Sequence, residues 1–198
     1  MTDKLLRTFI SVTVPKEVVS LQSMLKTTIN LQKGDIRWIR RGQIHLTLKF
    51  LGHTPPEFVD DINPILKKVV AQHKPMKLMV SGTGCFPDPG RPRVLWLGMD
   101  GNTAPLTSLV QDIHAKLEPL GFPLESESFT PHITIARISY PPQWTPDISA
   151  FLNTSYEPIP IMINRVRFMV SELLPNGAVH SILGTHFTIE ESINKENE

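Results

Sequence analysis

The chain has 198 residues, of which 40% are hydrophobic and 20% are charged, and its formal net charge is +1. This balance is typical of a globular protein and excludes a global basic field that would attract nucleic acid over the whole surface. The single cysteine, Cys85, excludes an internal disulfide framework, and no apolar run reaches the ~20 residues needed to span a bilayer. We therefore expect a cytoplasmic protein without a membrane segment, built as one domain or two tightly joined lobes.

A strand, a helix and two further strands are predicted near the start of the chain. Residues 8–14 are rich in β-branched residues and predict a strand. Pro15 and Glu17 suit the first turn of a helix, and apolar residues follow at helical spacing up to Ile29. Residues 36–39 predict a short strand, which precedes a longer strand that begins at His45.

A second helix is expected after Thr54, because Thr54 and Glu57 have the spacing of a capping box. Pro64 lies within its apolar pattern and is expected to kink the helix or shift its start. The remaining predicted elements are strands over 76–82 and 93–99, a turn-rich loop over 85–92, a helix from Thr103 to Gly121, a strand from His132, an irregular stretch over 141–158, and closing strands over 159–170 and 179–189.

One short motif occurs twice, 87 residues apart. The copies are His45-Leu46-Thr47-Leu48-Lys49-Phe50 and His132-Ile133-Thr134-Ile135-Ala136-Arg137. Residues i and i+2 of a strand project from the same face, so the histidine and threonine of each copy point one way and the aliphatic residues point the other. If the two strands meet, they present two imidazoles and two hydroxyls to one ligand. The repeat predicts a pseudo-duplicated α+β fold.

The residue types in the motif suit acid–base chemistry on an anion. Imidazole has an ordinary pKa of ~6.5, so one histidine can act as a base while the other acts as an acid. The hydroxyls of Thr47 and Thr134 can donate hydrogen bonds to an anionic oxygen. A lone histidine on a strand is more often structural, but a doubled motif with a shared polar face favours a functional role.

Other kinds of chemistry find less support. A zinc site usually needs three or four ligands, and neither copy of the motif has an acidic or sulfur neighbour at ligand spacing. No nucleophile elbow and no phosphate-binding P-loop is present in the sequence. We therefore expect neither a metal nor a nucleotide cofactor.

The paired motifs resemble those of the 2H phosphoesterases, and within them the RNA 2′,3′-cyclic phosphodiesterases, also called 2′-5′ RNA ligases. The resemblance extends over nearly the whole chain, through residues 7–15, 93–98 and 171–177. One departure is His180, where the family leads us to expect an aromatic residue such as tyrosine.

The resemblance implies an α+β, bilobal, pseudo-duplicated 2H phosphoesterase-like fold, in which antiparallel sheets line a central cleft and helices lie outside. Residues 1–190 would then form a single bilobal catalytic domain, and residues 191–198 a disordered tail. It also implies an enzyme that hydrolyses the terminal 2′,3′-cyclic phosphate of RNA to a 2′-phosphate. The implied partners are RNA ends or nucleoside 2′,3′-cyclic phosphates, with no obligate protein partner.

By the same resemblance, His45 is the proton donor to the leaving 3′ oxygen and His132 is the proton acceptor that activates water. Thr47 and Thr134 would hold the non-bridging oxygens. The residues alone support two histidine roles but leave their assignment open, because the two copies of the motif are nearly symmetric.

Candidate substrate contacts outside these four residues are Arg137, Phe50 and Phe86. Strict alternation places Arg137 on the face of Ile133, away from the histidines, where it would form a strand-end ion pair. A contact with phosphate or ribose requires the strand to bend. Phe86 could stack on a terminal base, whereas core packing is favoured for Trp38. A solvated turn is favoured over RNA binding for the basic residues Arg37, Arg40 and Arg41.

Two alternative functions remain open at this point. One is a nucleotide-binding module that keeps the cleft but does not turn over its ligand. The other is a ligase that joins RNA ends through a 2′-5′ bond by the reverse chemistry at the same site, which the sequence cannot separate from hydrolysis.

Overall fold

The computed structural model describes residues 5–29, 36–125, 128–139, 145–174 and 177–189, so the predicted tail over 191–198 lies outside the described residues. The elements, in chain order, are β1 (Leu6–Thr13), α1 (Lys16–Leu25), β2 (Ile36–Trp38), β3 (His45–Thr54), α2 (Phe58–Val70), β4 (Met76–Phe86), β5 (Val94–Asp100), α3 (Ala104–Leu117), β6 (His132–Ile138), α4 (Ser149–Leu152), β7 (Ile159–Ile163), β8 (Arg165–Leu174) and β9 (Gly177–Phe187). Short 3-10 turns cover Lys26–Thr28, Arg41–Gln43 and Glu118–Leu120.

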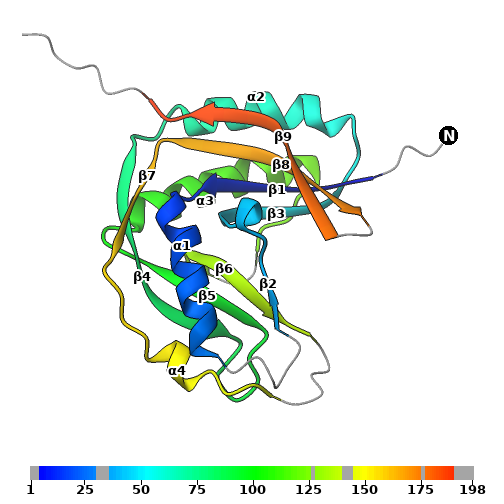
Figure 1. Cartoon of the computed structure of the whole chain (residues 1–198). Coiled ribbons are helices and arrows are strands. Elements are labelled where there is room, and N and C mark those ends of the chain that lie inside the picture. Colours follow the sequence, from blue (N-terminus) through cyan, green and yellow to red (C-terminus); the bar gives the residue numbers. More distant parts are fainter. Residues whose placement is uncertain (1–4, 30–35, 126–127, 140–144, 175–176, 190–198) are drawn as a thin grey trace, which may run out of the picture.

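The strands form one curved sheet in the order β7-β4-β5-β6-β3-β1-β8-β9, with β2 paired to β6 (Figure 1). Each pairing between these strands is antiparallel. The strands that carry the two motifs, β3 and β6, are neighbours at the centre and meet through the register pair Leu46 and Ile133. The predicted α+β class and the pseudo-duplicated halves are confirmed, and the two halves are hydrogen-bonded into a single sheet.

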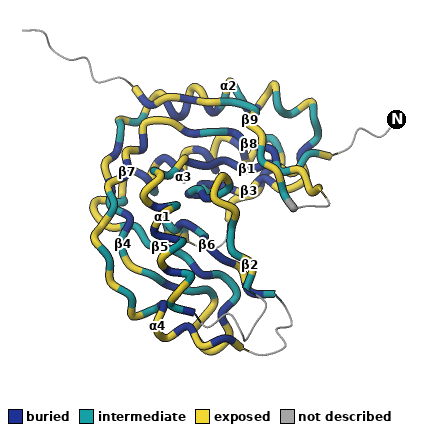
Figure 2. The backbone as a smooth tube through the Cα atoms, viewed as in Figure 1, coloured by how far each residue is buried: buried dark blue, intermediate teal, exposed yellow. Residues whose placement is uncertain are grey.

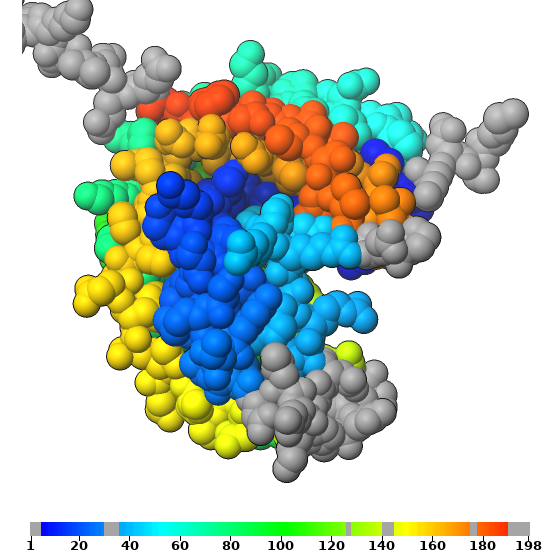
Figure 3. Space-filling model, in the orientation of Figure 1, coloured from blue at the N-terminus to red at the C-terminus, as the bar shows by residue number. Residues whose placement is uncertain are grey.

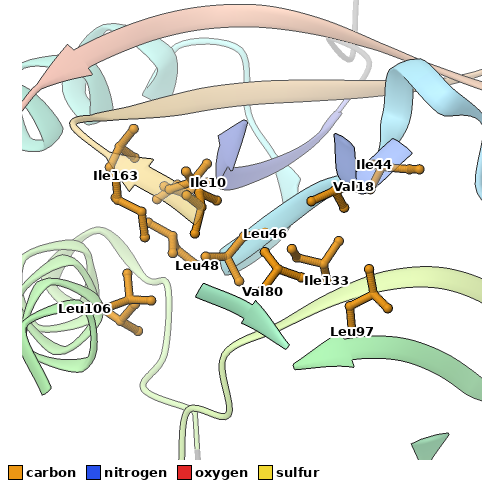
Figure 4. Close-up of a cluster of buried hydrophobic side chains, with 14 of the residues drawn as sticks. Ile10, Val18, Ile44, Leu46, Leu48, Val80, Leu97, Leu106, Ile133 and Ile163 are labelled. Carbon is orange, nitrogen blue, oxygen red and sulfur yellow. The ribbon is translucent and has the colours of Figure 1, made fainter. Parts of the chain in front are cut away.

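The core lies on the aliphatic face of the two motifs. Leu46 and Leu48 of β3 and Ile133 of β6 are 0–2% exposed and belong to one cluster of buried side chains. Figure 4 shows these three residues together with Val18 of α1 and Leu106 of α3. The apolar stripes of the helices therefore cover this face of the sheet, which leaves the histidine and threonine face for a ligand. Figure 2 shows the buried backbone concentrated in the central strands.

The predicted capping box at Thr54 is wrong. Thr54 is the last residue of β3, and its hydroxyl is 2.7 Å from that of Thr8 in the neighbouring strand β1. Helix α2 begins at Phe58 without a side-chain cap and continues through Pro64. The threonine is thus used to join two strands, because strand pairing brings a second buried hydroxyl within hydrogen-bonding distance.

The predicted strand over 159–170 is divided at Asn164 into β7 and β8. The two pieces pair in different halves of the sheet, since β7 lies beside β4 and β8 lies between β1 and β9. This segment therefore crosses from one half of the molecule to the other. In addition, β4 extends to Phe86, into the stretch predicted as a loop.

None of the helices in the described segments is long and apolar enough to cross a membrane.

Candidate active site

The register of β3 and β6 sets the two motifs against each other. Because Leu46 lies opposite Ile133 in an antiparallel pair, His45 lies opposite Thr134 and Thr47 lies opposite His132. The four side chains alternate around one patch of the sheet, on the face away from the core. The predicted meeting of the two motifs is thus what the strand pairing produces.

Each imidazole is oriented by an equivalent hydrogen bond to a backbone carbonyl oxygen. The Nδ1 atom of His45 lies 2.7 Å from the carbonyl oxygen of Gln43, and that of His132 lies 2.7 Å from the carbonyl oxygen of Thr130. A carbonyl oxygen only accepts, so each Nδ1 carries a proton and donates it. The Nε2 atom of each ring therefore remains to exchange a proton with a ligand.

Aromatic side chains from the flanking strands hold the His45 ring. It stacks on Phe9 of β1, with ring centroids 4.8 Å apart and an interplanar angle of 24°. The ring of His180, on β9, meets His45 edge-on at 5.6 Å and Phe9 at 5.0 Å. The ring of His180 thus packs against both Phe9 and His45.

The His132 ring has a different pair of neighbours. It meets Phe86 of β4 edge-on at a centroid distance of 5.0 Å and lies 6.3 Å from Trp96 of β5. Trp96 in turn packs against Phe86 at 5.2 Å. Each histidine is therefore fixed on two sides by rings from the half of the sheet to which it belongs.

Burial lowers the pKa of His45 to about 4. The hydrogen bond to Gln43 opposes this shift, and the positive charges of His180 and Arg137 add to it. Burial also lowers the pKa of His180. His45 is consequently neutral at pH 7 in the free protein, with the lone pair of Nε2 available.

A β-bulge occurs at the same position of each motif. Opposite β1, the register passes from Lys49 to Thr47 and skips Leu48, and opposite β5 it passes from Ala136 to Thr134 and skips Ile135. Two consecutive residues are then buried in each strand: Leu48 and Lys49 in β3, and Ile135 and Ala136 in β6.

The bulge resets the alternation for the sixth residue of each motif. Phe50 and Arg137 consequently line the same cavity as His45, Thr47 and Thr134. The expectation from strict alternation, which placed Arg137 on the face of Ile133, is wrong, because the strand bends at the bulge.

Two adjoining cavities lie over this face. The first, of about 330 Å³, is lined by His45, Thr134 and Arg137 among others. The second, of about 600 Å³, is lined by His132 and Phe86. Thr47 and Phe50 line both. The two cavities thus adjoin, and the space-filling view shows the molecule hollowed beneath the hairpin of β8 and β9 (Figure 3).

Several lining residues were not predicted from the sequence. Arg7, Phe9 and Gln43 contribute to the first cavity, and Arg93 and Lys49 to the second. Lys49 is 2% exposed, and its ammonium group donates to the carbonyl oxygen of Pro123 at 2.8 Å. A signal existed for Arg7 and Phe9, since they lie two residues apart on β1, which pairs with the strand of the first motif.

The other basic and aromatic candidates lie elsewhere. Trp38 packs against the core, with the Lys26 ammonium 5.5 Å from its ring centroid. Arg41 donates to the Ser23 hydroxyl at 3.0 Å, as suits an exposed turn. Among the residues that the structure describes, no group of three or more His, Cys, Asp or Glu side chains could hold a metal ion.

The model of the 2′-5′ RNA ligase superfamily matches residues 14–173 of this chain. The chain belongs to this superfamily. Among curated members, an RNA 2′,3′-cyclic phosphodiesterase of Thermotoga maritima is 32% identical over 179 residues, which cover 90% of this chain and 93% of the relative. The protein of the same name from Thermus thermophilus is 30% identical over 186 residues, which cover 90% of this chain and 88% of the relative.

Solved structures show the same superfamily fold. The crystal structure of TT0787 of Thermus thermophilus has a TM-score of 0.74 and 26% identity, covering 91% of this chain and 97% of that one. The structure of E. coli LigT complexed with NADP+ has a TM-score of 0.72 and 18% identity, covering 95% of this chain and the whole of that one. The predicted 2H phosphoesterase-like fold is thereby confirmed.

Proposed function

We propose that the protein hydrolyses the 2′,3′-cyclic phosphate at the end of an RNA to a 2′-phosphate. The observation that carries this proposal is the alternating set of two histidines and two threonines. Each histidine uses Nδ1 for a hydrogen bond to a backbone carbonyl, so both Nε2 atoms are available to a ligand. An acid, a base and two hydroxyl donors around one point are what displacement at a phosphodiester requires. The curated relatives of similar length, named RNA 2′,3′-cyclic phosphodiesterase, support the same reaction.

The proposed reaction follows from this arrangement. Nε2 of His132 accepts a proton from water, whose oxygen bonds to phosphorus as the bond from phosphorus to the 3′ oxygen breaks. Nε2–H of His45 donates a proton to that 3′ oxygen. Thr47 and Thr134 donate hydrogen bonds to the non-bridging oxygens, and Arg137 offsets the negative charge that develops on them.

The low pKa of His45 places a condition on this assignment. With a pKa of about 4, His45 is not a proton donor in the free protein at neutral pH. An adjacent phosphate anion favours the imidazolium and raises the pKa, so His45 would become the donor on binding. The reverse assignment, with His45 as the base, needs no such change.

A second candidate function is the joining of RNA ends through a 2′-5′ bond. The second cavity favours it, because about 600 Å³ beside His132 leaves room for another RNA end to take the place of water. Phe86 and Phe129 line this space and could contact a base. We also infer that the protein acts in the cytoplasm, on RNA ends or nucleoside cyclic phosphates and without a metal.

The test is to incubate the purified protein, in EDTA, with an oligonucleotide that ends in a 2′,3′-cyclic phosphate and to identify the product isomer. We expect a 2′-phosphate and full activity in EDTA. No turnover, or tight binding of nucleoside monophosphates without turnover, would favour a binding module. Activity lost in EDTA and restored by one added metal would contradict the metal-free mechanism.

A further inference from the structure

A third cavity adjoins the candidate active site beside His45. It has a volume of about 170 Å³, and its lining includes Ser11 of β1 and Arg167 of β8. Phe9, His45 and His180 line both this cavity and the first one. One layer of three rings, with centroids 4.8 to 5.6 Å apart, therefore separates the two spaces.

Arg167 is the cation of this third cavity. Ser11 and Arg167 are cross-strand partners in the pairing of β1 with β8, so their side chains lie next to each other. The Nε atom of Arg167 is buried and has no hydrogen-bond partner among the described residues, and Ser11 is only 4% exposed. A buried donor without an acceptor is costly, and a guanidinium binds phosphate oxygens well.

The charges around the two spaces are of one sign. The first and third cavities are lined by Arg7, Arg137 and Arg167, and no described aspartate or glutamate lines either of them. A cyclic phosphate diester carries one negative charge and lies, under the proposed function, beside Thr47 and Thr134. Arg167 is on the other side of the ring layer and thus remains for a second anion.

We propose that the third cavity binds the phosphodiester on the 5′ side of the terminal nucleotide, so that the protein prefers oligonucleotides to nucleoside cyclic phosphates. This inference rests on the proposed function. An RNA that ends in a 2′,3′-cyclic phosphate continues only through the 5′ oxygen of its last ribose. The next phosphate is therefore the second anion that such a ligand brings, one nucleoside away from the first.

The experiment compares kcat/KM for three substrates: a nucleoside 2′,3′-cyclic phosphate, a dinucleotide that ends in the same group, and that dinucleotide with an uncharged methylphosphonate linkage. The variants are Arg167→Gln, Arg167→Lys and, as a control, Arg165→Gln. Arg165 is exposed on the same strand and is not among the lining residues of the cavity, so its substitution removes the same charge without changing the lining.

We expect the unsubstituted protein to prefer the charged dinucleotide by ~10-fold or more over the other two substrates, as for one hydrogen-bonded charge pair. Arg167→Gln should bring this ratio close to one, Arg167→Lys should give an intermediate ratio, and Arg165→Gln should preserve it. Thermal unfolding followed by circular dichroism shows whether each variant is folded.

A preference that is absent, or that survives Arg167→Gln or the neutral linkage, would overturn the proposal for this cavity while leaving the proposed reaction intact. If no substrate is turned over, the proposed reaction fails instead. Calorimetric affinities for the mononucleotide and dinucleotide 2′-phosphates then test the cavity independently. Equal affinities for the two products would refute it.

Discussion

The two histidines share a backbone hydrogen bond but take their ring neighbours from different strands. Each donates its Nδ1 proton to the carbonyl two residues earlier in the chain. His45 is packed between Phe9 and His180, and burial lowers its pKa to about 4. His132 lies beside Phe86 at the edge of the larger cavity. The repeated motif therefore fixes which nitrogen faces the ligand, whereas neighbouring strands set the electrostatic environment.

Removing either imidazole should have the largest effect. We expect His45→Ala and His132→Ala each to lower kcat by ~10²–10⁴-fold, the range for a positioned acid or base. Both should remain folded, because the side chains lie on the face away from the core. Turnover of a cyclic-phosphate oligonucleotide is the measurement, and His53→Ala is the control, since His53 is exposed on the same strand. Near-normal turnover in either variant would remove that residue from the chemistry.

The difference between the two surroundings can be measured directly by NMR titration of the histidine rings. In the free protein His45 should protonate only near pH 4, because burial disfavours the imidazolium. Added inorganic phosphate should raise this pKa, since a nearby anion favours the charged ring. If His45 titrates near 6.5 without ligand, its surroundings do not act as described. If its pKa stays near 4 with phosphate bound, its assignment as the donor is wrong.

The threonines test whether the two halves handle the phosphate equally. Thr47→Val and Thr134→Val keep the β-branch that suits a strand and remove only the hydroxyl. Each should lower kcat/KM by ~10-fold, as for one hydrogen bond to a charged group. The thermal midpoint should change little. Unchanged kcat/KM in both variants would make the threonines structural, and an effect confined to one would show that a single half binds the anion.

The sixth residues of the motifs should give the smallest effects. Arg137→Gln removes a charge from the first cavity and should lower kcat/KM by less than ~10-fold. Phe50→Leu keeps an apolar side chain at a site that is 59% exposed and should change KM by less than ~3-fold. Steady-state kinetics on one oligonucleotide compares them. A larger effect for Phe50 than for Arg137 would mean that base contact outweighs charge at this position.

The sequence predicted the two central strands well, because each motif is bounded by apolar residues with period two. Arg137 was a candidate substrate contact, but strict alternation placed it on the wrong face. The bulge at Ile135 arises from the pairing with β5 and cannot be recognised in the composition. The contacts of His45 were also hidden, because Phe9 and His180 come from opposite ends of the chain. The capping box predicted at Thr54 was wrong because a threonine hydroxyl can either cap a helix or bridge two strands.

The matched bulges make the two hexapeptides interchangeable parts for protein design. Because Leu48 and Ile135 occupy the same extra place, the sixth side chain leaves either strand in the same direction. Exchanging phenylalanine and arginine between positions 50 and 137 would move the positive charge from β6 to β3 while the total charge stays constant. The two strands thus offer equivalent backbone positions, and single side chains decide which half of the cleft carries the positive charge.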